Sequence, residues 1–304
     1  MRLQSKDGVL DGVDNPPITY RMMWPEKLDK PAPGVVLAPG FGSSLQTSAY
    51  IQESLERVAE LGAVAISFNY SHIKVKSDDE VDTARLTCEN ADDDLRRVLA
   101  FAKENPMIDA KKMVGMGCSF GAHTMFRVKD MDMAAFIAFS LVPDFGKPFQ
   151  DKLTESKRFL WKMTQRFFGR GTKQMIDGYI QEINYNLFEQ AENFDLHENL
   201  RDITQPVTLI HGTEDILAAV EDIQQLTVAR NVQAHFIQGA GHKFKAEPSN
   251  NGVSELQQAI FVAQRAFLKL FSTTADSMGY RDLINDVARK HIANDDASEM
   301  RLAL

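Results

Sequence analysis

The sequence has few cysteines, no long apolar run and fewer basic than acidic residues. Its two cysteines, Cys88 and Cys118, match no metal-binding spacing and are too few for a disulfide framework. We therefore expect a protein with reduced thiols in the cytoplasm. No stretch approaches 18 consecutive apolar residues, which argues against a membrane span. Residues 1–17 lack the apolar segment of a signal peptide, so none is expected.

The charge balance is acidic. Against 42 aspartates and glutamates stand 34 lysines and arginines, which gives a net charge of −8. A net negative charge repels the phosphate backbones of nucleic acids, so we do not expect nucleic-acid binding. The 304 residues, 44% hydrophobic and 25% charged, suit a globular protein with one large α/β unit and an insertion.

Short apolar runs alternate with amphipathic helical patterns. Runs of this kind are typical of parallel strands buried on both faces. Apolar residues at helical spacing predict helices over residues 91–102 and 256–270. The alternation predicts an α/β fold with a mostly parallel sheet and helices on both faces. The predicted strands are Gly34–Ala38, Ala63–Asn69, Met113–Cys118, Ala134–Leu141, Val207–His211 and Val232–Ile237.

The alternation stops between residues 145 and 199. This stretch has ten aromatic residues and no convincing strand, and residues 147–173 contain eight basic and two acidic residues. We interpret it as a mainly helical lid over the carboxyl edge of the sheet, shaping an acyl or aryl pocket. Its cations have two other interpretations: contact with an anionic substrate or lipid surface, or a solvated helix face.

These patterns divide the chain into a core, an insertion and a tail. The core is predicted over residues 1–144 and 200–272, and the lid over residues 145–199. A helical tail is predicted over residues 273–304.

The motif with the clearest chemistry is Gly117-Cys118-Ser119-Phe120-Gly121, which fits G-x-S-x-G. It follows an apolar run and precedes a helical segment, as a nucleophile elbow must. The sharp turn strains the serine backbone and requires glycine on both sides. Ser119 is the predicted nucleophile.

A serine hydroxyl attacks a carbonyl efficiently only when a base takes its proton. His242, in a glycine-rich loop after the last predicted strand, is the candidate base. Asp215, on the loop that follows residues 207–211, is the candidate acid that orients the imidazole. Asp144, after the preceding strand, is the alternative acid. The order Ser119, Asp215, His242 is the one expected when a G-x-S-x-G elbow carries the serine.

The tetrahedral intermediate of such a reaction needs two preorganised hydrogen-bond donors. The backbone N–H of Phe120, directly after the nucleophile, is one candidate. The other is the N–H of Phe41, in the glycine-containing loop after residues 34–38. We expect the remaining groups near the motif to have structural roles: Cys118 as a packed thiol, and His123 and His211 as packing residues. His72 is a candidate for lining the site.

Taken together, these segments resemble the α/β-hydrolase fold superfamily, in its dienelactone-hydrolase, cinnamoyl-esterase and prolyl-oligopeptidase-like branch. The resemblance implies a nucleophile at Ser119, an acid at Asp215, a base at His242 and oxyanion donors at Phe41 and Phe120. One departure is a proline at position 39, where many members have a histidine that helps to hold the loop. The matching segments are PGFG at 39–42, GCSFG at 117–121, HGTED at 211–215 and GAGH at 239–242.

The function expected from these residues is cleavage of a carboxylic ester through an acyl-enzyme. Two alternatives stay open: an acyltransferase, thioesterase or peptidase that uses the same triad, and a non-catalytic ligand-binding protein of this fold. The sequence has no phosphate-binding loop, H-E-x-x-H zinc motif, EF-hand or cysteine cluster, so we predict no cofactor and no metal. The expected partner is a small-molecule acyl substrate, and a homodimer is left open.

Overall fold

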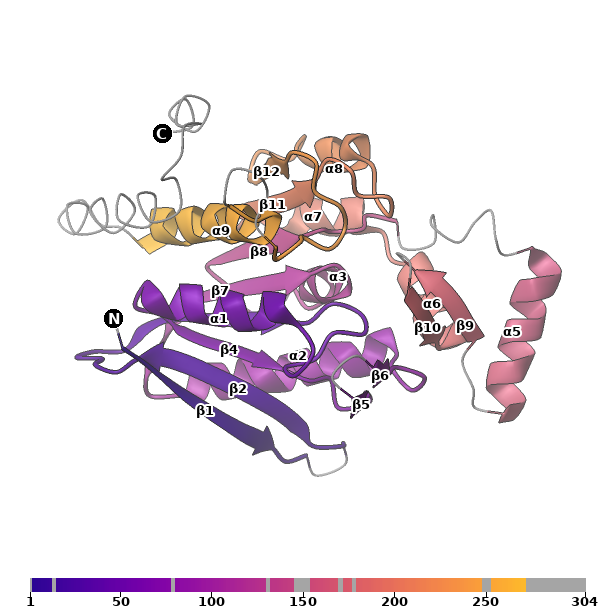
Figure 1. The fold of residues 1–304 in the computed structure, drawn as a ribbon, viewed down its shortest axis with the longest axis horizontal. Helices are drawn as coiled ribbons and strands as arrows, with labels where there is room; N and C mark the ends of the chain where they lie inside the picture. Colours follow the sequence, from indigo (N-terminus) through magenta and orange to yellow (C-terminus); the bar gives the residue numbers. More distant parts are fainter. Residues whose placement is uncertain are drawn as a thin grey trace.

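The computed structural model describes residues 2–12, 15–77, 80–129, 132–144, 154–168, 172–176, 179–247 and 253–271. Its centre is an eight-stranded sheet with the order β1-β2-β4-β3-β7-β8-β11-β12 (Figure 1). The strands are β1 (Leu3–Leu10), β2 (Ile18–Pro25), β3 (Ala32–Ala38), β4 (Val64–Phe68), β7 (Ile108–Cys118), β8 (Ala135–Phe139), β11 (Val207–Gly212) and β12 (Val232–Ile237).

Six neighbouring strands of this sheet are parallel, namely β4, β3, β7, β8, β11 and β12, whereas β1 and β2 add an antiparallel edge. The predicted α/β-hydrolase fold, with its mostly parallel sheet, is thus confirmed. The carboxyl ends of parallel strands lie at one edge of the sheet, so the loops after β3, β7, β8, β11 and β12 meet there. This edge gathers all the predicted site residues.

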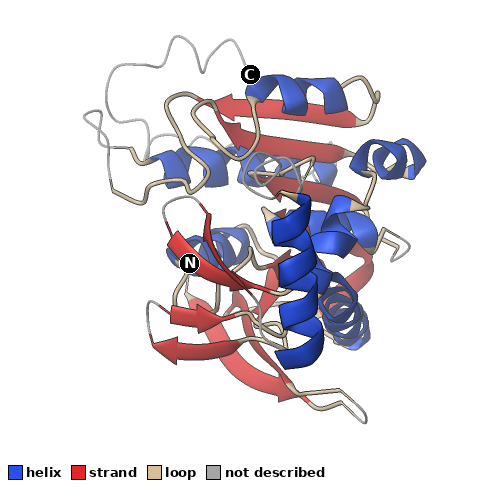
Figure 2. Ribbon diagram, turned by 90° about the vertical axis from the view of Figure 1, so that its right-hand side faces the viewer, coloured by secondary structure: helices blue, strands red, loops and turns tan. Residues whose placement is uncertain are grey.

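Helices cover both faces of the sheet (Figure 2). On one face, α1 (Ala49–Glu60) and α9 (Glu255–Phe271) bury apolar side chains against the strands. On the other face, α2 (Cys88–Glu104) and α3 (Phe120–Arg127) form a second core. The predicted stripes of α2 and α9 are confirmed, because Leu95 and Phe267 are among their buried residues.

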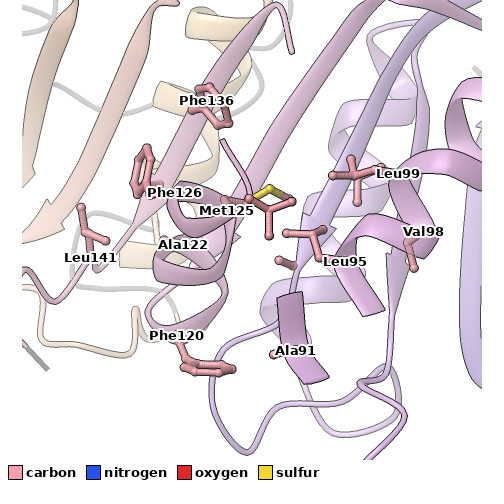
Figure 3. Close-up of a cluster of buried hydrophobic side chains, with 14 of the residues drawn as sticks. Ala91, Leu95, Val98, Leu99, Phe120, Ala122, Met125, Phe126, Phe136 and Leu141 are labelled. Carbon is pink, nitrogen blue, oxygen red and sulfur yellow. The ribbon is translucent and has the colours of Figure 1, made fainter. Parts of the chain in front are cut away.

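The core beneath the serine motif is made by α2 and α3 together. Figure 3 shows Leu95 and Leu99 of α2 beside Met125 of α3, with Phe120 at the start of α3. All of these side chains are buried. The first turn of α3 therefore rests on a rigid, close-packed support, which fixes the backbone that follows Ser119.

The expectation that residues 145–199 contain no strand is wrong. The strands β9 (Thr172–Ile176) and β10 (Tyr179–Ile183) pair antiparallel in a separate hairpin. Each strand has only five residues and mixes polar with apolar residues without regular alternation, so the pattern is too short to be recognised without its partner. A second small pair is formed by β5 (Lys74–Ser77) and β6 (Glu80–Asp82).

Four further helices complete the described structure. They are α5 (Glu155–Phe168), α6 (Tyr185–Glu192), α7 (Leu196–Asp202) and α8 (Val220–Leu226). The predicted tail at residues 273–304 lies outside the described residues, as do residues 145–153 of the insertion. In the part of the chain that is described, no helix combines the length and the apolar character needed to cross a bilayer.

Candidate active site

Ser119 lies at the sharp turn between β7 and α3. Its backbone angles, φ 50° and ψ −115°, fall in a region that residues with a side chain rarely adopt. A Cβ atom on Gly117 would come within 2.6 Å of Ala122 N, and one on Gly121 would collide with the carbonyl oxygens of Ala38 and Pro39. Both glycines of the motif are therefore required by close backbone contacts, as the sequence predicted.

A chain of hydrogen bonds joins the three residues singled out as nucleophile, base and acid. The Nδ1 atom of His242 lies 2.8 Å from Oδ2 of Asp215, and its Nε2 atom lies 2.9 Å from Oγ of Ser119. A carboxylate accepts, so Nδ1 carries the proton toward Asp215 and Nε2 accepts from the serine hydroxyl. The alternative acid, Asp144, is exposed, whereas the carboxylate of Asp215 is fully buried.

Two neighbours orient the Asp215 carboxylate. The backbone N–H of Leu217 donates to Oδ1 at 2.8 Å, which leaves Oδ2 for His242. His211 Nε2 lies 3.6 Å from Oδ2 and 2.9 Å from the carbonyl oxygen of Ala218. Burial lowers the pKa of His211, so its ring is neutral and its Nε2–H donates to Ala218. His211 thus packs against the acid and supports the loop that carries it.

Ser140 holds the loop of the candidate base, a role that the sequence analysis missed. It follows β8, and its hydroxyl donates to the carbonyl oxygen of His242 at 2.7 Å. Its backbone φ is 45°, and its N–H donates to Ile210 O at 2.9 Å. A non-glycine residue with strained backbone beside a functional loop is the signature of a constrained site. The predicted strand Ala134–Leu141 included Ser140, whereas β8 ends one residue before it, at Phe139.

The loop after β3 packs against the serine turn. A Cβ on Gly40 would lie 3.3 Å from the carbonyl oxygen of Cys118, so the two backbones are neighbours. The rings of Phe41 and Phe120 meet edge to face, with 6.0 Å between their centroids. The two backbone segments that carry the predicted donors are therefore adjacent at this edge of the sheet.

Tyr70 connects these segments and was also missed. Its hydroxyl donates to the carbonyl oxygen of Pro39 at 3.2 Å, and its ring contacts that of Phe120 at 5.8 Å. Tyr70 is buried, and burial raises the pKa of its hydroxyl, so the donor keeps its proton.

A polar network lies behind α3. Arg127 donates to Asp92, to the hydroxyl of Thr124 and to Nδ1 of His123. The guanidinium also lies over the ring of Phe120, 5.4 Å from its centroid. Burial, and after it the charge of Arg127, lowers the pKa of His123 well below its ordinary value. His123 is therefore a neutral structural residue, as expected.

The cysteines are poor nucleophiles in this fold. Burial raises the pKa of Cys118 to about 12, with a further contribution from the charge of Asp215. Burial also raises the pKa of Cys88 to about 11. A thiol reacts as the thiolate, so neither cysteine competes with Ser119 at neutral pH.

His72, the candidate for lining the site, has its Nδ1 atom 2.9 Å from the hydroxyl of Ser71.

Comparison with known proteins supports the fold. A family model described as an alpha/beta hydrolase domain matches residues 187–269, which include Asp215 and His242. No curated protein matches the chain in sequence. Est1E from Butyrivibrio proteoclasticus, solved with ferulic acid bound, is similar in structure, with a TM-score of 0.68 at 16% identity. That match covers 88% of this chain and 100% of Est1E.

Two further solved structures are similar over most of their length. Alpha/beta hydrolase domain-containing protein 10 from mouse gives a TM-score of 0.60 at 20% identity, covering 87% of this chain and 99% of that one. P91, a dienelactone hydrolase-like promiscuous phosphotriesterase from metagenomic libraries, gives a TM-score of 0.56 at 16% identity. That match covers 89% of this chain and 99% of P91. These likenesses show that the chain has the α/β-hydrolase fold.

Proposed function

We propose that this protein is a serine hydrolase that cleaves a carboxylic ester through an acyl-enzyme. The observation that carries the proposal is the unbroken hydrogen-bond chain from Ser119 through His242 to Asp215. These groups come from loops 27 and 123 residues apart in sequence, so their alignment is specific to the fold. In such a chain the imidazole makes a weak alcohol into an effective nucleophile.

The reaction follows from these positions. Nε2 of His242 takes the hydroxyl proton as Oγ of Ser119 bonds to the ester carbon, while Asp215 stabilises the imidazolium. The backbone N–H groups of Phe41 and Phe120 stabilise the oxyanion. The C–O bond to the alcohol then breaks, and the alcohol leaves with the proton from His242. Water, deprotonated by the same histidine, releases the carboxylic acid and restores the serine.

The lid role of residues 145–199 is part of this proposal. The end of the insertion packs close to the nucleophile helix, because the ring of Phe194 lies 4.7 Å from that of His123. Its base is tied to the core by hydrogen bonds from Thr83 to Glu182 O and from Asn184 to Ala84 O. Est1E binds ferulic acid, so esters of aromatic acids are the first substrates to test.

The decisive experiment compares Ser119→Ala with Ser5→Ala. Ser5 is an exposed serine on β1, at the far edge of the sheet, so its substitution removes the same hydroxyl from an unrelated place. We expect the wild type and Ser5→Ala to hydrolyse p-nitrophenyl esters and to be labelled by a fluorophosphonate probe. Ser119→Ala should lose both properties while its thermal unfolding midpoint is unchanged. Retained turnover in Ser119→Ala would refute the proposal.

The same assay separates the alternatives. With alcohols or amines added, an acyltransferase forms the transfer product faster than the free acid, whereas a hydrolase forms mainly the acid. Thioesters and aminoacyl amides in the substrate panel identify a thioesterase or a peptidase. Absence of probe labelling in the folded wild type would favour a ligand-binding protein.

A further inference from the structure

Helix α5 exposes large apolar side chains in a row. Phe159, Leu160 and Phe167 leave 66%, 67% and 68% of their surface accessible. Phe159, Met163 and Phe167 recur at every fourth residue, so they lie on one side of the helix, with Leu160 beside them. Single exposed apolar residues are ordinary, but three on one helix side, with the half-buried Met163 among them, form a patch that requires a partner.

The opposite side of α5 attaches the helix to the rest of the protein. Trp161 is buried there, and its Nε1–H donates to Ile183 O at 3.2 Å. Its ring packs against those of Tyr185 and Phe188, with centroids 5.3 and 5.2 Å away. In Figure 1, α5 is the outermost helix at this end, and α6 with β10 lies between it and the sheet. The apolar row therefore lies on the side of α5 opposite to the one that packs against the rest of the protein.

A row of cations borders the apolar row. Arg158, Lys162 and Arg166 also recur at every fourth residue. Arg158 pairs with Glu192 at 2.8 Å, and Lys162 pairs with Glu189 at 3.0 Å. Arg166 is exposed, one turn further along, and forms no ion pair with any residue in the described ranges.

The charge of α5 is opposite in sign to that of the whole chain. The helix has four basic residues and one acidic residue, a net charge of 4 − 1 = +3. The whole chain has −8, so the other residues together have −8 − 3 = −11. Positive charge is thus combined with exposed aromatic side chains on one outermost helix, which is the composition of helices that lie in a membrane interface.

We propose that α5 docks this protein on an anionic lipid surface. Phe159 and Phe167 enter the boundary between headgroups and acyl chains, and Arg166 contacts the lipid phosphates. Fourteen residues at about 1.5 Å each make the helix about 21 Å long, so it lies flat on the surface. A second copy meeting the same face would bring two basic rows together, which favours lipid over self-association.

The test is sedimentation of the full-length protein with large vesicles, made either of phosphatidylcholine alone or with about a third phosphatidylglycerol. We expect binding to the anionic vesicles, weakened by high salt because the attraction is partly electrostatic. Arg166→Gln should weaken this binding by about fivefold, because that is the gain in affinity expected from one cation next to an anionic lipid surface. Phe159→Ser combined with Phe167→Ser should weaken it by tenfold or more.

The control is Val228→Ser, which removes an 86% exposed apolar side chain beyond the end of α8 and should leave binding unchanged. Lack of sedimentation with anionic vesicles would overturn the proposal, and so would an equal loss in Val228→Ser. A concentration-dependent dimer that disappears in the Phe159 and Phe167 variant, without vesicle binding, would instead identify a second copy as the partner. Binding is measured without turnover, so the result does not depend on the role of Ser119.

Discussion

The hydroxyl of Tyr70 donates a hydrogen bond to the carbonyl oxygen of Pro39, 3.2 Å away. Tyr70 lies just after β4, and Pro39 lies just after β3, so the contact joins neighbouring strand ends. Fixing this carbonyl fixes the plane of the peptide that leads into Gly40 and Phe41. Many α/β-hydrolases have a histidine at position 39 that helps to hold this loop. Here a tyrosine from the next strand supplies a hydrogen bond to the same segment.

The first prediction concerns Tyr70→Phe, which removes this hydroxyl and keeps the ring. We expect kcat for ester hydrolysis to fall by about tenfold, less than the 10²–10³ typical of losing an oxyanion donor itself. The KM should change little, because the loop acts mainly in the transition state. The unpaired Pro39 carbonyl should also lower the free energy of unfolding by about 1–3 kcal/mol.

The matched control for Tyr70 is Tyr20→Phe, since Tyr20 is a buried tyrosine of the same core, on β2. Steady-state kinetics and urea unfolding of both variants provide the comparison. A purely structural role would leave kcat of folded Tyr70→Phe at the wild-type value. That outcome, or an equal loss of kcat in Tyr20→Phe, contradicts the positioning role.

The second prediction concerns stability in mild acid. Burial lowers the pKa of His123 well below its ordinary value, and it also lowers the pKa of His211 and of His235. The unfolded chain binds a proton at each of these histidines near pH 6.5, whereas the folded chain does not. This contribution to stability is complete above about pH 6.5 and is lost as the pH falls from there toward the folded pKa values.

Urea unfolding at pH 7.5 and at pH 5.5 measures this loss. Each such histidine contributes up to about 1.4 kcal/mol per pH unit within this window. His123→Gln keeps an acceptor for Arg127 but does not titrate, so it should lose less stability between the two pH values than the wild type. His197→Gln, a change at an exposed histidine, should behave like the wild type. If His123→Gln lost as much unfolding free energy between pH 7.5 and pH 5.5 as the wild type, His123 would be protonated in the folded state.

The central strands and the site loops were predictable because their signals are local. The strand Val232–Ile237 has the predicted bounds, and the segments with Ser119, Asp215 and His242 all follow predicted strands. In a parallel sheet this is sufficient to bring their loops to one edge. Their hydrogen-bond distances were not predictable, since they depend on how each loop turns back over the sheet.

Other features could not be predicted because no local pattern marks them. Strand β1 is mostly exposed and is recognisable only through its pairing with β2. The strands β9 and β10 are likewise recognisable only because they pair with each other. Ser140 and Tyr70 are ordinary residues in the sequence. Their roles come from hydrogen bonds to positions 102 and 31 residues away, which only the tertiary structure brings within reach.

The third prediction concerns the close approach of the serine turn to β3. In Gly121→Ala the new methyl group would collide with the carbonyl oxygens of Ala38 and Pro39, which are backbone atoms and cannot move aside independently. We expect the free energy of unfolding to fall by more than about 2 kcal/mol and the fluorophosphonate labelling of Ser119 to slow sharply, because the turn and the loop of Phe41 are forced apart.

The matched variant for Gly121 is Gly241→Ala, which lies at the same edge of the sheet, next to His242. Its methyl group would meet only the carbonyl oxygen of Glu214, at 4.0 Å, which is an ordinary contact. Its free energy of unfolding should therefore stay within about 1 kcal/mol of the wild-type value. Urea unfolding of both variants measures the difference. If Gly121→Ala were as stable as Gly241→Ala, the close packing of the turn against β3 would be wrong, and with it the adjacency of the two oxyanion-donor segments.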